Sequence, residues 1–224
     1  MSTLTTPPLS TLLTQLFRDA EATSAALEQQ MAGTPAEERA RLMTRLMTST
    51  TDYRAMYGQM KEFHLAVSPE TGTLLYMLAR AAKARSIIEF GTSFGISTLH
   101  LAAALRDNGG GRLISTEFEP SKIAKARANF IAAGLSDLVE VREGDALETL
   151  ASDLPEQIDL VLLDGAKSLY PPVLALLEKR LRTGALIVAD NADWCPEYLS
   201  RARAPGGQYL SVPFAGDVEL SMKL

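Results

Sequence analysis

The chain of 224 residues is 46% hydrophobic and 22% charged, which is enough to bury one substantial core. Its 22 basic and 27 acidic side chains give a formal net charge of −5. No basic block would neutralise a phosphate backbone, so we expect no nucleic-acid partner and favour a small-molecule ligand. The single cysteine, Cys195, cannot form an internal disulfide and has no zinc-site spacing around it.

The sequence also lacks signals for secretion or membrane insertion. Its first residues have neither the basic nor the apolar segment of a signal peptide, and no apolar run approaches the ~20 residues of a membrane span. We therefore expect a cytoplasmic protein without a membrane partner.

The first part of the chain, residues 1–66, has a helical pattern. Apolar residues from Leu9 to about Met60 recur at helical spacing with a break at Gly33, which predicts two or three helices. Tyr53, Tyr57 and Met60 share this spacing, which favours packing over a role in an aromatic acceptor site. We interpret residues 1–66 as a helical lid or dimerisation segment and expect a homodimer.

The second part, residues 67–224, alternates short apolar runs with helical segments after a first helix that ends near Lys83. This pattern predicts an α/β domain with a mostly parallel sheet covered on both faces. The predicted strands are Ser86 to Phe90, Arg112 to Glu117, Val139 to Arg142, Asp159 to Asp164, Ala185 to Asp190, Tyr209 to Val212 and Val218 to Lys223. The helices between them are about Ile96 to Arg106, Ser121 to Ala133, Ala146 to Ser152 and Tyr170 to Lys179.

The last two strands are separated only by Pro213 to Asp217, so they should pair as an antiparallel hairpin. A nicotinamide-binding sheet is normally all parallel. A seven-stranded, mostly parallel sheet with an antiparallel last strand instead resembles the Rossmann-like class I methyltransferase fold.

The turn after the first strand reads Glu89-Phe90-Gly91-Thr92-Ser93-Phe94-Gly95. Gly91 and Gly95 allow a tight turn and a close backbone approach to a ligand, and the next helix offers free amides at its start. A dinucleotide site needs a third glycine where Ser93 stands, which weakens that interpretation. A tight turn without a ligand is the remaining alternative.

Two acidic residues follow the next strands. Glu117 ends the second strand 22 residues after Gly95, where a carboxylate can accept hydrogen bonds from both ribose hydroxyls of an adenosyl cofactor. Asp145, after the third strand, could accept from the exocyclic amine of adenine. Either residue could instead be an exposed acid at a strand end.

The ends of the fourth and fifth strands carry Asp164, Lys167, Asp190 and Asn191. Because ligands bind beyond the carboxyl ends of such strands, two carboxylates and one amide should converge there, a donor set suited to Mg²⁺ or another divalent cation. Lys167 would lie beside them. The alternative is that the aspartates cap strand ends and Lys167 is a solvated surface charge.

Taken together, these motifs resemble the cation-dependent O-methyltransferases of the catechol and caffeoyl-CoA type. The similar stretch runs from about Val67 to Trp194, and Trp194 matches a tryptophan of the caffeoyl-CoA type. Its marks are Ser68 to Gly72, Glu89 to Gly95, Glu117 with Pro120, Gly144 to Ala146, Asp164 to Lys167, and Asp190-Asn191.

The resemblance implies roles for these residues. Asp164, Asp190 and Asn191 would hold the cation, and Lys167 would be the catalytic base, with Asp164 also a catalytic residue. Trp194 would contact the acceptor. The residues expected to contact S-adenosylmethionine are Ser68, Glu89, Gly91, Thr92, Ser93, Gly95, Ser97, Glu117, Asp145, Ala146 and Asp164.

The sequence thus predicts an S-adenosylmethionine-dependent O-methyltransferase that methylates a small aromatic molecule with vicinal hydroxyls, assisted by Mg²⁺ or another divalent cation. Three alternatives stay open: a metal-independent small-molecule methyltransferase, an NAD-binding oxidoreductase and a non-catalytic binding protein. Of the two histidines, His100 lies among apolar helical residues and should pack in the core, whereas His64 could reach the site.

Overall fold

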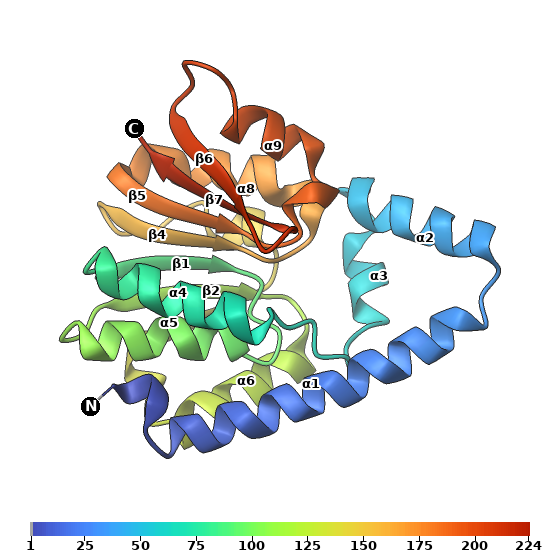
Figure 1. The fold of residues 1–224 in the computed structure, drawn as a ribbon, viewed down its shortest axis with the longest axis horizontal. Helices are drawn as coiled ribbons and strands as arrows, with labels where there is room; N and C mark the ends of the chain where they lie inside the picture. The colour runs from blue at the N-terminus through green and yellow to red at the C-terminus, as the bar shows by residue number, and fades with distance from the viewer. Residues whose placement is uncertain (1) are drawn as a thin grey trace.

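The computed structural model describes residues 2–224, apart from the side chains of Gln30, Leu46 and Met47. One seven-stranded sheet crosses the molecule in the order β3-β2-β1-β4-β5-β7-β6 (Figure 1). Its strands are β1 (Ser86–Phe90), β2 (Arg112–Glu117), β3 (Val139–Glu143), β4 (Ile158–Leu163), β5 (Leu181–Ala189), β6 (Tyr209–Phe214) and β7 (Val218–Lys223).

The first five strands are parallel, and β7 lies antiparallel between β5 and β6. The predicted hairpin and mostly parallel sheet are therefore confirmed. In the centre of the sheet Ile88 pairs with Ile114 and Val161, and all three side chains are fully buried. Apolar residues on both faces of these strands explain why helices cover the sheet from two sides.

Two helical layers bury the two faces of the sheet. Alternate residues of one strand, Ile87 and Ile88, belong to separate apolar clusters. Helices α4 (Pro69–Ala81), α5 (Ile96–Asp107) and α6 (Pro120–Ala132) contribute to the cluster of Ile87. Helices α7 (Ala146–Thr149), α8 (Tyr170–Leu177) and α9 (Pro196–Ala202) contribute to the cluster of Ile88.

The sequence pattern did not predict α9. This helix has only seven residues, and its buried residues Tyr198 and Ala202 lie one turn apart, too few to establish a helical period. The strand boundaries also differ at one important point. β4 and β5 end at Leu163 and Ala189, so Asp164 and Asp190 begin the following loops rather than ending the strands.

The N-terminal segment forms three α-helices, α1 (Leu9–Ala32), α2 (Ala36–Thr48) and α3 (Tyr53–Gly58), as the sequence indicated. The buried residues of α1 lie in its first half, and the rest of α1 extends beyond the sheet (Figure 1). Helix α2 returns toward the carboxyl ends of the strands, where Ser168 Oγ donates to the carbonyl of Ser49 at 2.7 Å. Within the described residues, no helix is both long and apolar enough to cross a membrane.

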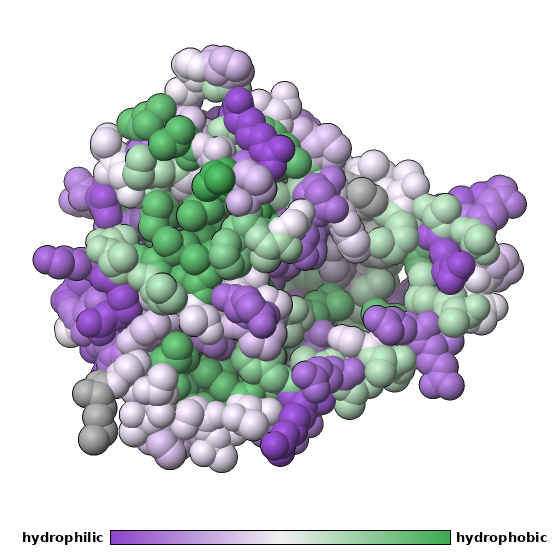
Figure 2. Space-filling view, in the orientation of Figure 1, coloured by the Kyte–Doolittle hydropathy of each residue, from purple (hydrophilic) through white to green (hydrophobic). Residues whose placement is uncertain are grey.

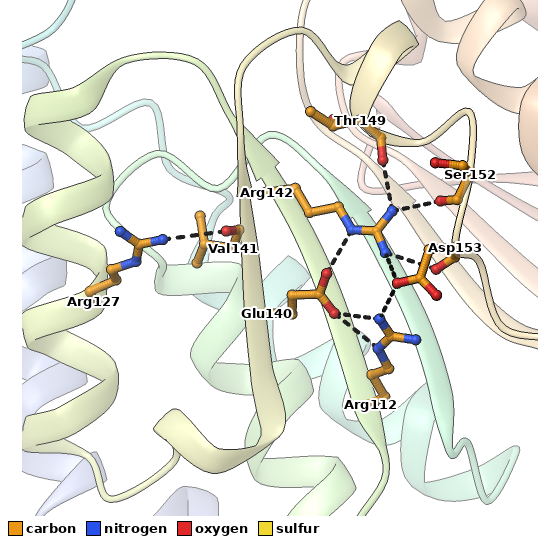
Figure 3. A network of polar contacts seen from close by, with 8 residues as sticks. All are labelled: Arg112, Arg127, Glu140, Val141, Arg142, Thr149, Ser152 and Asp153. Atoms are coloured by element: carbon orange, nitrogen blue, oxygen red, sulfur yellow. Dashed lines mark hydrogen bonds and ion pairs between the residues drawn. The ribbon is translucent and has the colours of Figure 1, made fainter.

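An arginine cluster anchors the chain after β3 (Figure 3). Arg142 donates to the carbonyls of Thr149 at 2.7 Å, Ser152 at 2.9 Å and Asp153 at 2.8 Å, so it holds the end of α7 and the loop that follows. Glu140 accepts from Arg142 at 2.7 Å and also from Arg112 on β2. The position of α7 matters because its first residue lies at the site described next.

Candidate functional site

A cavity with about 620 Å³ of open space lies at the carboxyl ends of β1, β2, β3 and β4. Most of its wall comes from the loops that follow these strands, and α3 and the segment after it close one side. The lining residues are Tyr53, Tyr57, Leu65, Phe90, Gly91, Ser93, Thr116, Glu117, Phe118, Glu119, Lys122, Gly144, Ala146, Asp164, Gly165 and Ala166.

The turn after β1 forms one wall, and its two glycines are required by the protein itself. Gly91 has φ +104°, and a Cβ there would lie 2.5 Å from the carbonyl oxygen of Asp164. Gly95 has φ +86°, and its Cβ would lie 2.4 Å from the ring of Phe130 on α6. The close approaches at these glycines are to the chain after β4 and to α6, and the predicted approach to a ligand stays a prediction. Ser93, between them, lines the cavity.

Glu117 at the end of β2 is held rigidly at the cavity wall. One carboxylate oxygen accepts from the backbone amide of Ser93 at 2.9 Å, and the other accepts from the amides of Phe118 at 2.9 Å and Glu119 at 3.0 Å. A carboxylate offers about four acceptor positions, so Oε2, which accepts only from Ser93, keeps one free. Glu117 is 9% exposed, and Oε2 is the oxygen with capacity to accept from a ligand hydroxyl.

Glu89 lies behind the turn rather than at the cavity wall. Its carboxyl group is fully buried and accepts from Ser97 Oγ at 2.6 Å and from the hydroxyls of Thr98 and Ser115 at 2.5 Å. Burial raises the pKa of Glu89 to about 7 despite these hydrogen bonds. The predicted contacts Glu89 and Ser97 thus bind each other and support the turn from beneath.

A smaller cavity with about 200 Å³ of open space adjoins the first and shares Leu65 and Ser93 with it. Thr92 and Ser97 line it, as does His64, whose ring stacks on Phe94 at a centroid distance of 4.0 Å. Ser68 is the N-cap of α4, where its Oγ accepts from the Thr71 amide at 3.0 Å, and its predicted contact with the cofactor stays a prediction. His100 is buried and bonds the Ile96 carbonyl, in agreement with a packing role.

The loop after β3 forms the opposite wall through Gly144 and Ala146. Asp145, between them, caps α7 by accepting from the Leu147 amide at 2.9 Å, and its other oxygen accepts from Arg54 of α3 at 2.5 Å. This ion pair ties the N-terminal helices to the cavity. The predicted contact between Asp145 and adenine stays a prediction.

A buried polar cluster follows β4 and β5. Lys167 Nζ donates to Asp164 Oδ1 at 3.2 Å and to the hydroxyl of Tyr170 at 2.8 Å, and that hydroxyl donates to the Asp190 carbonyl at 2.7 Å. Burial raises the pKa of Asp164, and burial together with Asp164 raises the pKa of Asp190 to about 8. The structure therefore brings Asp164, Lys167 and Asp190 together as predicted.

These residues fit a divalent cation in their donor chemistry. Two buried carboxyl groups whose charges repel each other need a proton or a cation between them, and Lys167 supplies only one positive charge. In the described part of the chain no three His, Cys, Asp or Glu side chains are grouped to hold a metal ion. The third protein ligand would therefore be the amide of Asn191, which here donates to Asp217 at 3.4 Å.

The structure adds lining residues that the motifs did not indicate. Tyr53 and Tyr57, for which packing was favoured, pack and also line the cavity, whereas Met60 lies outside its described wall. Phe118 and Lys122 line it from the chain after β2. In the sequence, the only indication that Phe118 and Lys122 line the cavity was their closeness to Glu117. Trp194, predicted to contact the acceptor, lies half-buried just after Asn191 and outside the described walls of both cavities.

Comparisons with known proteins identify the family of the chain. Residues 34–207 match the model of the O-methyltransferase family. The catechol O-methyltransferase of Niastella koreensis is 38% identical over 130 residues, covering 57% of this chain and 58% of that protein. The catechol O-methyltransferase of Mycobacterium tuberculosis is 38% identical over 127 residues, covering 57% of each. The chain thus aligns with less than two thirds of these relatives' length.

Solved structures show the same fold. An O-methyltransferase of Bacillus cereus in complex with S-adenosylhomocysteine superposes with a TM-score of 0.63 at 26% identity, covering 71% of this chain and 82% of that one. The O-methyltransferase TomG of Streptomyces achromogenes, in complex with S-adenosylmethionine, gives 0.63 at 26% identity and covers 81% and 89%. The predicted class I methyltransferase fold is confirmed. Because the family match spans more than half of the sequence, the chain belongs to the O-methyltransferase family.

Proposed function

We propose that this chain transfers the methyl group of S-adenosylmethionine to a hydroxyl oxygen of a small aromatic acceptor with vicinal hydroxyls, assisted by a divalent cation. One observation carries the proposal: Glu117 and Asp164 line the same cavity. Glu117 is suited to bind a ribose, and Asp164 belongs to the polar cluster. The methyl donor and the methyl acceptor can therefore be held side by side.

The cofactor half of the proposal is supported by the walls around Glu117. Its carboxylate is fixed by three backbone amides, and Oε2 keeps one position from which it can accept a hydrogen bond from a ribose hydroxyl. Ala146 is buried and gives an apolar surface suited to a flat base. When bound, S-adenosylmethionine supplies a methyl group on a positively charged sulfur.

The acceptor half is supported by the aromatic wall and the polar cluster. Tyr53 and Tyr57 face the cavity from α3, and the relatives named catechol O-methyltransferase support an aromatic acceptor. Asp164, Asp190 and Asn191 would hold the cation. A divalent cation, when bound, favours the deprotonated form of a hydroxyl beside it.

Lys167 belongs to the polar cluster beside the proposed acceptor. Its ammonium is buried and donates to the Asp164 carboxylate and the Tyr170 hydroxyl, and a fixed positive group stabilises negative charge that develops near it. We therefore assign Lys167 to stabilising the negative charge that develops on the acceptor oxygen. Tyr170 orients it, because the tyrosine hydroxyl accepts from Lys167 and donates to the Asp190 carbonyl.

Methyl transfer from labelled S-adenosylmethionine to a catechol tests the proposal. We expect product with Mg²⁺ or Mn²⁺, none in EDTA, and recovery when the metal is added back. A matched acceptor with a single hydroxyl should react far more slowly. Absence of transfer to a panel of vicinal diols, in a protein that binds S-adenosylhomocysteine, would contradict the proposed acceptor class.

A metal-independent methyltransferase is the second candidate. Two contacts favour it: Lys167 already engages Asp164, and the Asn191 amide is directed to Asp217. Under this alternative, rates in EDTA and in Mg²⁺ would be equal. The same experiment therefore separates the two functions.

A further inference from the structure

Lys122, near the start of α6, is a buried lysine that lines the principal cavity. The residue is 4% exposed. Its Nζ lies 3.3 Å from Ser93 Oγ and 5.5 Å from the ring centroid of Phe94. A lysine is rarely buried without a compensating partner, because removing an ammonium from water is costly.

The described partners of Lys122 leave its hydrogen-bonding capacity largely unused. An ammonium has three donors, and among the described residues the only acceptor within hydrogen-bonding distance of Nζ is the Ser93 hydroxyl. Burial lowers the pKa of Lys122, and the carboxylates of Glu117 and Glu119 partly oppose this effect. The ammonium thus lies at a cavity wall with donors left for a ligand.

The neighbours of Lys122 indicate which part of a ligand it meets. The Ser93 that contacts Nζ also donates its backbone amide to Glu117, so the ammonium and the Glu117 carboxylate flank the same short stretch of wall. The carboxylate can only accept hydrogen bonds, and the ammonium can only donate them. A vicinal diol satisfies both, because each hydroxyl donates through its hydrogen and accepts through its oxygen.

We propose that Lys122 is a cofactor-binding residue that donates a hydrogen bond to a ribose hydroxyl oxygen of the adenosyl group, while Glu117 Oε2 accepts from a ribose hydroxyl. This inference rests on the proposed function, since it assumes an adenosyl ligand in this cavity. In this arrangement the Glu117 carboxylate accepts a hydrogen bond from the ribose diol, and the Lys122 ammonium donates one to it. Removing the donor should weaken binding of any ligand that carries the diol.

Isothermal titration with three ligands tests the inference. The ligands are S-adenosylhomocysteine, 5′-methylthioadenosine, which lacks the amino-acid carboxylate, and 2′,3′-dideoxy-5′-methylthioadenosine, which also lacks the diol. For Lys122→Met we expect about ten-fold weaker binding of the first two, as for loss of a hydrogen bond from a charged group, and unchanged binding of the third. The KM for S-adenosylmethionine should rise by a similar factor with kcat nearly unchanged.

Lys125→Met is the matched control. Lys125 lies on the same helix, with its Nζ 5.0 Å from the Phe94 ring centroid, but its side chain is 55% exposed and pairs with Glu62 at 3.5 Å. We expect wild-type affinities for all three ligands. Lys122→Gln keeps a neutral donor and should give an intermediate loss, and it replaces Lys122→Met if that variant does not fold.

Two results would overturn the inference. An equal loss for the dideoxy ligand would mean that Lys122 only supports the wall. A loss confined to S-adenosylhomocysteine would mean that the ammonium contacts the amino-acid carboxylate instead of the ribose. If the wild-type protein bound none of the adenosyl ligands, the proposed function would fail, and the role of Lys122 with it.

Discussion

At the scale of single residues, the site contains two carboxylates in opposite environments. Glu117 accepts from backbone amides at a cavity wall, whereas Glu89 accepts from hydroxyls in the core. The sequence placed both at the end of a strand but could not distinguish their surroundings. Glu89 became a buried support because Ser97, Thr98 and Ser115 converge on it from α5 and β2, contacts that sequence spacing does not reveal.

The environment of Glu89 predicts a pH-dependent stability. Its pKa is about 7 in the folded protein against 4.5 for an unperturbed glutamate, so between these values the folded state holds a proton that the unfolded state has lost. The Glu89 contribution to stability is therefore greatest below pH 4.5 and falls as pH rises to about 7, by on the order of 3 kcal/mol.

Urea unfolding at pH 5 and pH 8 checks this expectation. The Glu89→Gln variant should show a smaller decrease in unfolding free energy between the two values than the wild type, and the Asp190 carboxyl, whose pKa is also raised, contributes to the decrease that remains. Glu148→Gln, at an exposed position, should keep the wild-type difference. An undiminished difference in Glu89→Gln would show that another group is responsible.

Lys167 gives a second prediction at this scale. Lys167→Met removes the ammonium from the polar cluster but leaves the walls around Glu117 intact, so kcat should fall by about 100-fold or more, with little change in the affinity for S-adenosylhomocysteine. Single-turnover rates and calorimetry measure the two quantities. Lys179→Met is the control, and a variant that loses affinity and turnover in parallel would argue against a catalytic role.

At the scale of secondary structure, the most predictable elements were the buried strands. The predicted bounds of β1, β2 and β7 match the observed ones, because their apolar runs end at glycine, charge or turn residues. Short elements were less predictable. The helix expected from Ala146 to Ser152 ends at Thr149, and α8 gives way to a 3₁₀ turn at Glu178.

Arg142 explains how the short helix α7 is held, and it gives a third prediction. Arg142→Met leaves the carbonyls of Thr149, Ser152 and Asp153 without their donor, so the free energy of unfolding should fall by about 2 kcal/mol. Affinity for S-adenosylhomocysteine should also fall, because α7 supplies Ala146 to the cavity. Chemical unfolding and calorimetry measure both.

Arg127→Met is the comparison for this experiment. Arg127 lies on α6 and contacts the Val141 carbonyl only at 3.5 Å (Figure 3). Its pair with Glu143 is exposed on both sides, so the loss of stability should stay within about 0.5 kcal/mol. Equal effects of the two substitutions would mean that Arg142 does not anchor the loop.

At the scale of the whole molecule, the sequence foresaw the division into N-terminal helices and an α/β domain but not how they meet. The N-terminal segment contributes Tyr53, Tyr57 and Leu65 to the cavity wall. The ion pair of Arg54 with Asp145 joins this segment to the α/β domain. These residues are far apart in sequence, and helical spacing carries no information about such contacts. The expected lid role of the segment stays a prediction.

One apolar surface bears on the expected homodimer. The pairings Leu210 with Met222 and Val212 with Leu220 place these side chains on one face of the β6-β7 hairpin, and Leu210 and Val212 are 63% and 55% exposed. Figure 2 shows apolar surface gathered over the strands that face the viewer in Figure 1. We expect this face to pair with a second copy, in addition to any contact of the N-terminal helices.

Light scattering tests this expectation. The wild-type mass should be twice the 24.2 kDa of one chain, and the double variant Leu210→Glu, Val212→Glu should shift the protein toward the monomer. Ile131→Glu, at a position 68% exposed on α6, is the control and should leave the mass unchanged. A dimer that persists in the double variant would place the interface elsewhere.

The position of β7 between β5 and β6 also sets an order of assembly during protein synthesis. The described cavity walls are complete at Ala166, and β5 closes the parallel part of the sheet at Ala189. β6 leaves the ribosome before β7, but β7 is its partner in the sheet. Until β7 is synthesised, β6 is therefore unpaired and β5 is an edge strand. A growing chain therefore passes through a stage in which the part that contains the cavity can fold while β6 and β7 are still unpaired.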